Sequence, residues 1–241
     1  DETFDHDGFT TDVRILVAED NLTNQLYVEE ILMREGWHCD IVKNGSEAIK
    51  AVAAEDYDLI LMDCQMPEVD GYEATRQIRK QESEGRLKGH RPILALTANA
   101  IKGDRELCLD AGMDDYMPKP FNPSHLVTMV RAFLNGDQRE SMNPGGVQAD
   151  STVTFRSDLP PIDFDSLYNR RMGDASFAAS LLDSFAEDGR DRMNQIVRLT
   201  DHGDTAGVSK VAHSLKGIAG IVAAQDIQCL SARIESAGKT G

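Results

Sequence analysis

Two spacings of hydrophobic residues alternate along the first half of the chain. Short runs of consecutive apolar residues are typical of strands buried on both faces, and apolar residues three and four positions apart are typical of helices. Strands are predicted at residues 13–18, 39–42, 59–62, 93–96 and, more weakly, 115–118. Helices are predicted at residues 23–35, 46–55, 71–84, 103–111 and 124–134. Five strand–helix units predict an α/β doubly wound, five-stranded parallel sheet with helices on both faces.

The pattern changes after residue 135. Residues 136–160 have no sustained period and are rich in Gly, Pro, Ser and Asp, which predicts a flexible linker. No strand pattern returns after it, and helices are predicted near residues 163–172, 174–199, 204–220 and 224–237. Such a succession is typical of an antiparallel helical bundle. The predicted organisation is a tail (1–11), an α/β domain (12–135), the linker and a helical bundle (161–241).

Charge and composition exclude several classes of function. The chain of 241 residues has a formal net charge of −16, which argues against a general binder of nucleic acid or of anionic membranes. Its four cysteines form no C-x-x-C pair, as expected for a protein of the reducing cytoplasm. No apolar run approaches the roughly 18 residues that span a bilayer. We therefore expect a cytoplasmic chain without membrane contact.

Acidic residues stand at the ends of two predicted strands. Glu19 and Asp20 follow the first strand, and Asp63 ends the third. These strands are neighbours in a doubly wound sheet, so the three carboxylates should converge and repel one another without a counter-ion. Ligands that are all oxygen suit Mg²⁺. A Mg²⁺ site is predicted here, in preference to the alternative that Glu19 and Asp20 only cap the next helix.

The fourth and fifth strands deliver two further polar groups to the same edge. Thr97 ends the fourth strand, and Lys119 follows the fifth. A hydroxyl, an ammonium group and a divalent cation around one carboxylate would suit a phosphoryl group carried by that carboxylate. Asp63 would then be a nucleophile that forms an acyl phosphate.

A second candidate lies in the helix KVAHSLKGIAGIVAA of the predicted bundle. At 100° per residue the apolar residues lie on the side opposite His213. The residues within about 60° of His213 are Ser209, Lys210, Lys216, Gly217 and Gly220. The pattern predicts that His213 points away from the bundle. The lysines would help to hold a phosphoryl group on its ring, and the glycines would leave room for another protein.

Four stretches carry a family resemblance: VAEDNLTNQ, LILMDCQMPEVDGYEATRQIR, LTANA and DYMPKPF. Together they resemble the receiver domain of two-component response regulators, and most of all the receivers attached to hybrid sensor histidine kinases. The resemblance implies that Asp63 is the phosphoacceptor. It implies Mg²⁺ bound by Asp20, Asp63 and the backbone carbonyl of Gln65, with help from Glu19.

The same resemblance implies roles for residues around the phosphoacceptor. Thr97 and Lys119 would be the pair that senses the phosphoryl group. Tyr116 matches the aromatic switch position of the family, although it could simply pack at the sheet edge. Gln65 and Asn99 stand where the family tunes the rate of dephosphorylation.

The segment HSLKG resembles the active helix of histidine-containing phosphotransfer (HPt) domains, over about residues 161–238. This resemblance implies that His213 is phosphorylated on a ring nitrogen and relays phosphoryl groups between receiver aspartates. The family's bundle has four helices, whereas this chain ends after the third long one. We expect a bundle without its last helix; the short first helix or a second copy of the chain are the alternatives for filling the groove.

The combined resemblance implies a phosphorelay signalling module. The expected partners are an upstream histidine kinase domain, within the same parent protein, and the receiver of a downstream response regulator. A dimer through the receiver or the incomplete bundle is a further expectation. The chain contains no Gly-rich nucleotide-binding loop, so the ATP-dependent step is expected from the parent hybrid kinase, which could be membrane-anchored.

Two other functions are alternatives to the relay. An aspartate-nucleophile, Mg²⁺-dependent phosphatase would carry a second acid two residues after the nucleophile, where this chain has Gln65. A response regulator with a DNA-binding output would carry a basic recognition helix, whereas residues 161–241 hold 11 acidic and 9 basic residues. Neither alternative accounts for the surroundings of His213.

Overall fold

The structure is a computed structural model that describes residues 13–97, 102–119, 121–136, 162–163, 167 and 174–240. The chain divides into two compact units, Asp1–Leu134 and Asn135–Gly241. The predicted tail and nearly all of the predicted linker lie outside the described residues, as does most of the predicted helix at 163–172.

The first unit is built on one sheet of five parallel strands. The order of the strands is β2-β1-β3-β4-β5. Their bounds are β1 Arg14–Ala18, β2 His38–Val42, β3 Leu59–Asp63, β4 Ile93–Thr97 and β5 Asp115–Pro118. Every predicted strand is present with its ends displaced by no more than one residue, which confirms the parallel sheet.

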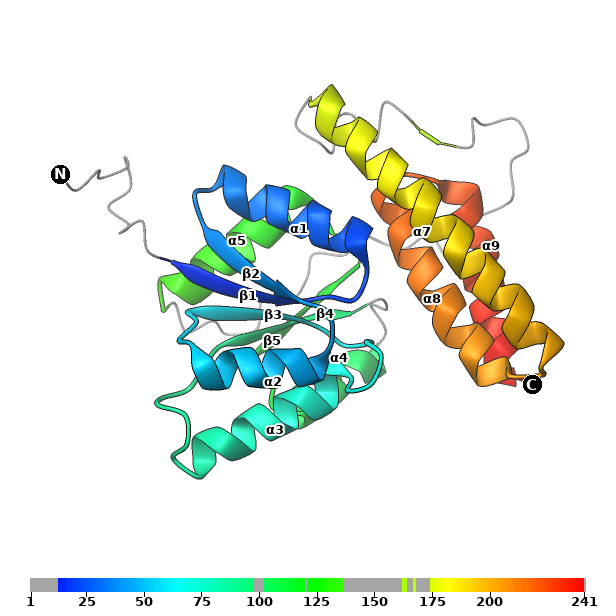
Figure 1. Cartoon of the computed structure of the whole chain (residues 1–241). Coiled ribbons are helices and arrows are strands. Elements are labelled where there is room, and N and C mark those ends of the chain that lie inside the picture. Colours follow the sequence, from blue (N-terminus) through cyan, green and yellow to red (C-terminus); the bar gives the residue numbers. More distant parts are fainter. Residues whose placement is uncertain are drawn as a thin grey trace. The chain divides into compact units, whose positions relative to one another are not determined.

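Five helices cover the two faces of this sheet. They are α1 Leu22–Arg34, α2 Gly45–Ala54, α3 Gly71–Ser83, α4 Lys102–Asp110 and α5 Pro123–Leu134. Helices α1 and α5 lie on one face, and α2 and α3 lie on the other (Figure 1). Cys108 of α4 belongs to the same buried cluster as Ala48 of α2 and Ala74 of α3, so α4 also packs on that second face.

The strands are continuous apolar runs because both of their faces are covered. Leu59, Ile60, Leu61 and Met62 of β3 have no exposed surface, and burial of each large apolar side chain is worth about 1.5–3 kcal/mol. The chain reverses its direction of winding between β1 and β3, the point at which doubly wound sheets open a crevice beyond the carboxyl ends of the strands. The fold therefore places the ends of β1 and β3 side by side at a natural binding site.

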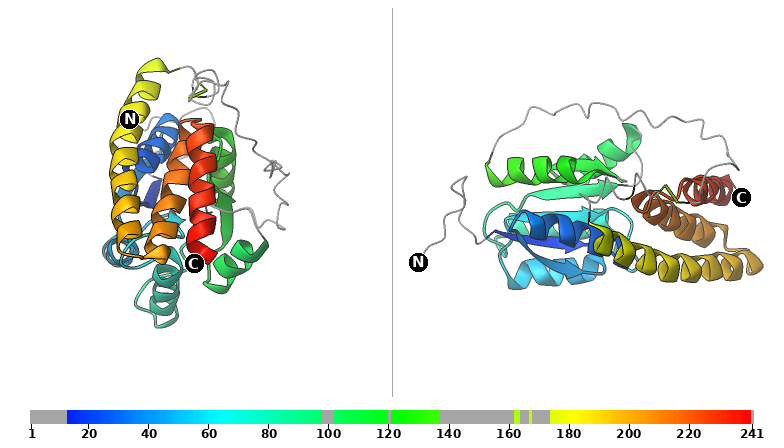
Figure 2. Two further views of the ribbon diagram at one scale, coloured as in Figure 1. Left: turned by 90° about the vertical axis from the view of Figure 1, so that its right-hand side faces the viewer. Right: turned by 90° about the horizontal axis from the view of Figure 1, so that it is seen from above.

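In the part of the second unit that the structure describes, three long helices run side by side: α7 Ala175–Asp201, α8 Thr205–Ile221 and α9 Gln225–Thr240 (Figure 2). The side chain of Asp204 accepts a hydrogen bond of 2.9 Å from the backbone N–H of Gly207 and caps α8, as predicted. Although α7 has 27 residues, none of the described helices combines the length and the apolar character needed to cross a membrane.

Helices α8 and α9 approach each other closely. A Cβ atom added at Gly238 of α9 would lie 2.7 Å from the backbone oxygen of Thr205 at the start of α8. Ser231 precedes Glu235 by four residues and Glu235 precedes Gly238 by three, so the three share one face of α9. Ser231 and Glu235 are both buried. The face of α9 that meets α8 at Gly238 therefore also carries two buried polar side chains.

Candidate functional site

Three acidic side chains meet at the carboxyl ends of β1 and β3. Glu19, Asp20 and Asp63 each offer a carboxylate oxygen, and these atoms lie within 4.8 Å of one another. Glu19 is fully buried, and Asp63 exposes 7% of its surface. They meet because β1 and β3 are hydrogen-bonded in register, with Ala18 opposite Met62. The structure thus brings together the three acids that the strand ends indicated.

Lys119 stands between two of these carboxylates. Its Nζ atom lies 2.5 Å from Oε2 of Glu19 and 2.9 Å from Oδ2 of Asp63. The chain delivers it from the end of β5, on the far side of β4. One ammonium group cannot neutralise three carboxylates, so the cluster stays negative when all three are ionised. That excess charge, on oxygen ligands alone, favours a divalent cation.

Polar residues of the first turns of α1 hold Glu19 in place. The side-chain amide of Asn24 donates to Oε1 of Glu19 at 2.7 Å, and that of Gln25 donates to its backbone oxygen at 2.6 Å. Asn21 caps the helix by accepting from the N–H of Asn24. These supporting residues were missed as site residues, although their spacing of two, five and six residues from Glu19 places them in the turn that follows β1.

The surroundings of Asp63 change its acidity. Burial raises its pKa from the ordinary value of 3.8 to about 7, against the opposing charge of Lys119, and the charges of Glu19 and Asp20 raise it further. Burial alone would lower the pKa of Lys119, but Asp63 and Glu19 outweigh burial and raise it. The N–H of Gln65 donates to Oδ1 of Asp63 at 3.1 Å. The ionised carboxylate is thus costly to hold here without a further cation.

We expect the Mg²⁺-free chain to be stabilised by Asp63→Asn at pH 8 but not at pH 4. An acid with a raised pKa keeps its proton in the folded state after the unfolded chain has lost it. The wild type therefore loses stability as the pH rises from about 4 to about 7, and the variant escapes this loss. The gain at pH 8 should be at least about 1.4 kcal/mol, the value of one pKa unit. Urea denaturation at both pH values measures it.

The control for this experiment is Asp110→Asn, which alters an exposed acid of α4. It should change the free energy of unfolding by less than about 0.5 kcal/mol at either pH. An Asp63→Asn chain whose stability parallels the wild type over the whole range would contradict the buried, crowded carboxylate.

The remaining predicted residues of the first site take different positions. Thr97 is buried at the end of β4, and its backbone oxygen accepts a hydrogen bond of 2.5 Å from the N–H of Lys119. Tyr116 is partly buried and packs against the core on the face of α2 and α3. The side chain of Gln65 is exposed. Asn99 lies outside the described residues.

The predicted exposure of His213 is wrong. His213 exposes 7% of its surface, and Ser209 and Gly220 are buried with it. The helical wheel assigned one buried face to α8, but α8 packs against both α7 and α9, and His213 lies on the side toward α9. Lys210 is exposed and Gly217 borders open space, as expected.

A buried acid explains why His213 tolerates this burial. Nδ1 of His213 lies 2.9 Å from Oε1 of Glu235, and Nζ of Lys216 lies 2.7 Å from Oε2 of the same carboxylate. Ser209 donates to the backbone oxygen of Glu235. Lys216 is thus engaged by Glu235 rather than free beside the ring. Sequence reasoning missed Glu235; its one signal was a polar stripe, with Ser231, on an otherwise amphipathic helix.

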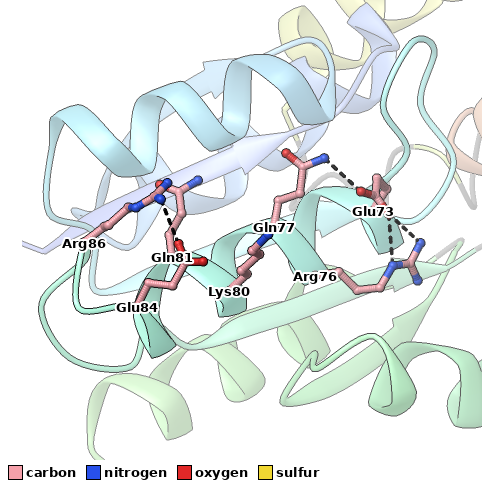
Figure 3. Close-up of a pocket in the computed structure, with 7 residues that line it drawn as sticks. All are labelled: Glu73, Arg76, Gln77, Lys80, Gln81, Glu84 and Arg86. Atoms are coloured by element: carbon pink, nitrogen blue, oxygen red, sulfur yellow. Dashed lines mark hydrogen bonds and ion pairs between the residues drawn. The ribbon is translucent and has the colours of Figure 1, made fainter.

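A separate groove runs along α3 (Figure 3). Its side chains pair with one another: Glu73 accepts from Arg76 and from Gln77, and Arg86 pairs with Glu84. None of its lining residues belongs to the acidic cluster or contacts Asp63 in the described structure. The groove is a solvated, charged helix surface, and the chemistry of the first unit lies at the strand ends.

Comparison with known proteins connects both sites to signalling families. The family of the response regulator receiver domain matches residues 15–131, and that of the Hpt domain matches residues 180–241. Hybrid signal transduction histidine kinase B of Dictyostelium discoideum is 42% identical over 130 residues, which cover 51% of this chain. The match covers 7% of that kinase, so the chain spans a small part of this curated relative.

Two solved structures are also similar. The receiver domain of a sensor histidine kinase from Pseudomonas aeruginosa, with magnesium coordinated in its active site cleft, is 45% identical; the match covers 51% of this chain and 98% of that one, with a TM-score of 0.46. A Saccharomyces cerevisiae complex of a histidine phosphotransfer protein with the receiver of its downstream regulator matches at 28% identity, covering 54% and 94%, with a TM-score of 0.50. By the two family matches, the chain belongs to the two-component signalling proteins and carries a receiver domain followed by an Hpt domain, the parts of a phosphorelay module.

Proposed function

We propose that Asp63 accepts a phosphoryl group from a phosphohistidine and that His213 relays such groups to and from receiver aspartates. The observation that carries the first half is the site of Asp63. Its carboxylate is almost buried, lies 2.9 Å from Lys119 and stands beside two further acids at the sheet's switch point. A phosphoryl donor can still reach a carboxylate in this position. Its ionised form is costly in free energy unless a cation is close by.

The residues of the cluster fit a Mg²⁺ ion. Three carboxylates within 4.8 Å supply hard oxygen ligands and an excess of negative charge. Asp20 and Asp63, with the backbone carbonyl of Gln65, would hold the ion. Glu19 already contacts Asn24 and Lys119, so it would add negative charge near the ion without being one of its direct ligands. When bound, Mg²⁺ would offset the charge of the phosphoryl oxygens. The related Pseudomonas receiver binds magnesium in its cleft.

The transfer follows from the groups at the crevice. A carboxylate oxygen of Asp63 attacks phosphorus, an O–P bond forms, and the N–P bond of the donor breaks with its electron pair returning to the imidazole. Lys119, already 2.9 Å from Asp63, would contact a phosphoryl oxygen of the product. Thr97 ends the adjacent strand and would donate its hydroxyl to another oxygen.

Other residues would adjust the lifetime and the readout of the acyl phosphate. We assign Tyr116 of β5 the role of the aromatic switch residue, whose position would change when Asp63 is phosphorylated. It lies three residues before Lys119 and packs, partly buried, against the core. Gln65 and Asn99 would tune dephosphorylation. The exposed side chain of Gln65 lies beside the carboxylate that its own N–H contacts.

The partners follow from the two domains. We propose receiver boundaries of 12–135 and HPt boundaries of 161–241, within a cytoplasmic part of a hybrid sensor kinase. The donor to Asp63 would be the phosphohistidine of a kinase domain, and the acceptor from His213 would be the receiver of a separate regulator. The Dictyostelium relative is a hybrid kinase, and the yeast complex joins a phosphotransfer protein to a receiver. A dimer through the receiver or the incomplete bundle is also part of the proposal.

Labelling with a small phosphodonor tests this proposal. The chain is incubated with labelled acetyl phosphate or phosphoramidate, with Mg²⁺ or with EDTA, and the label is sorted by stability in acid and base. We expect Mg²⁺-dependent, base-labile label that disappears in Asp63→Asn. Acid-labile label should disappear in His213→Gln. Asp110→Asn serves as the control for an exposed acid.

Three results would contradict the proposal. Label that persists in the double variant Asp63→Asn, His213→Gln would place the phosphoryl group elsewhere. Base-labile label of equal yield in EDTA would remove the role of the cation. A folded wild-type chain that takes no label from either donor would refute the phosphoacceptor assignment.

A further inference from the structure

Asn24 of α1 is enclosed beside the acidic cluster. It exposes 5% of its surface, and its side-chain amide donates a hydrogen bond of 2.7 Å to Oε1 of Glu19. The amide cannot be turned round, because its oxygen would then face the carboxylate, acceptor against acceptor. In this orientation Oδ1 of Asn24 is fully enclosed and has no hydrogen-bond partner among the described residues. A buried acceptor without a partner destabilises the fold. An apolar side chain of similar size would avoid this cost, so stability alone does not explain an asparagine here.

The contacts of Glu19 leave neither of its oxygens open to a cation. Oε1 accepts from the amide of Asn24 and, at 3.3 Å, from the backbone N–H of Asn21, which occupies both of its lone pairs. Oε2 lies 2.5 Å from Nζ of Lys119, whose positive charge repels a second cation. One oxygen of Glu19 lies within 4.8 Å of those of its two acidic neighbours, yet both of its oxygens are already engaged.

The first turn of α1 is fixed against the end of β1. The amide of Gln25 donates to the backbone oxygen of Glu19 at 2.6 Å, and Asn21 caps the helix by accepting from the N–H of Asn24 at 2.9 Å. The side chains of Asn21, Asn24 and Gln25 are all buried. The amide of Asn24 is therefore held in one place, and it restrains the carboxylate of Glu19 in turn.

The number of carboxylates in direct contact with a cation affects which cation is preferred. Mg²⁺ is usually bound by about one or two carboxylates and keeps water molecules, whose places phosphate oxygens can take. Ca²⁺ takes about six to eight oxygen ligands in a flexible arrangement and accepts further carboxylates readily. Direct contact with Asp20 and Asp63 alone suits Mg²⁺. A third carboxylate in contact would favour Ca²⁺ and would occupy a place that a phosphoryl oxygen needs.

We propose that Asn24 is a specificity-determining residue, which keeps Glu19 out of direct contact with the cation and so favours Mg²⁺ over Ca²⁺. The inference rests on the cation of the proposed function. Without the amide of Asn24, one lone pair of Oε1 is released and the carboxylate can turn toward the ion. The preference for Mg²⁺ then falls, because a third acid becomes available as a ligand.

Calorimetric titration of the full chain with MgCl₂ and, separately, with CaCl₂ at pH 8 measures the two dissociation constants. The test variant is Asn24→Leu, which has a similar volume and removes both the donor and the unpaired acceptor. We expect the ratio of the two constants to shift toward Ca²⁺ by at least about tenfold, the usual effect of losing a partner that orients a group at a metal site. The control Asn194→Leu changes an exposed asparagine of α7 and should leave the ratio unchanged.

A double-mutant cycle shows whether Asn24 acts through Glu19. Glu19→Gln alone should weaken the binding of both ions, because negative charge is lost, and should leave their ratio unchanged, because Glu19 is not a direct ligand. Addition of Asn24→Leu to Glu19→Gln should also leave the ratio unchanged, because no carboxylate remains at position 19 to be released.

The outcomes separate this inference from the function on which it rests. An unchanged ratio in Asn24→Leu with Mg²⁺ binding intact would overturn the inference and leave the role of Asp63 in place. A shift that persists in the Glu19→Gln background would also overturn it. A ratio altered by Glu19→Gln alone would do so even if Asn24→Leu failed to fold, since Glu19 would then already be a ligand. A wild-type chain that binds neither ion would refute the cation of the proposed function, and this inference with it.

Discussion

Lys119→Met should destabilise the first unit by about 3–5 kcal/mol at pH 8 in the absence of Mg²⁺, the loss expected when one partner of a buried ion pair is removed. Lys119 is the cation that contacts both Glu19, which is fully buried, and Asp63. Without it, two enclosed carboxylates face each other and Asp20. Urea denaturation, followed by a probe of the first unit, measures the loss.

The pH dependence of this loss identifies its cause. Asp63 has a pKa of about 7 and can take up a proton at pH 5, where it no longer needs the ammonium group. The destabilisation by Lys119→Met should therefore be smaller at pH 5 than at pH 8. Added Mg²⁺ should restore part of the stability at pH 8. The control Lys80→Met changes an exposed lysine of α3 and should have little effect at either pH.

A loss of the same size at both pH values would show that the methylene stem of Lys119 matters rather than its charge. No loss at all would mean that the carboxylates relax into solvent. Either result would contradict the view that Lys119 holds a crowded acidic cluster together.

Gly71→Ala should destabilise the first unit by more than about 3 kcal/mol and disturb the proposed phosphoacceptor, Asp63. A Cβ atom at Gly71 would lie 2.1 Å from the backbone oxygen of Asp63 and 2.9 Å from its carbonyl carbon. Backbone atoms cannot move aside as a flexible side chain can. The start of α3, capped by Asp70, would have to retreat from the end of β3.

The same substitution at Gly217 is the matched control. An added Cβ there meets nothing within 4 Å, and alanine is favoured over glycine in a helix by about 1 kcal/mol. Gly217→Ala should therefore stabilise the second unit. Thermal unfolding and Mg²⁺-dependent labelling of both variants check the contrast. A Gly71→Ala chain with wild-type stability and labelling would show that β3 and α3 adjust freely.

The first site could be predicted largely from the sequence because its residues stand at the ends of predicted strands. Asp63 ends an apolar run, and Lys119 directly follows the last strand. Parallel strands bring such positions to one edge whatever the details of packing. The support of Glu19 by Asn24 and Gln25 needed the structure, because it depends on how α1 turns back over β1.

The second site was predicted less well for a physical reason. A helical wheel compares residues within one helix, whereas the burial of His213 is decided by Glu235, 22 residues later on the next helix. A polar side chain is counted as outward-facing until its partner is known. The pair forms because α8 and α9 pack closely, and that packing is not encoded in the periodicity of either helix.

Lys119 is joined to the ends of three other strands at once, and its ammonium group pairs with Glu19 after β1. Its ammonium group reaches Asp63 on β3, and its backbone N–H is bonded to the carbonyl of Thr97 on β4. A change of charge on Asp63 alters its attraction to this ammonium group. We therefore expect such a change to act directly on the segment that follows β5, through the lysine alone.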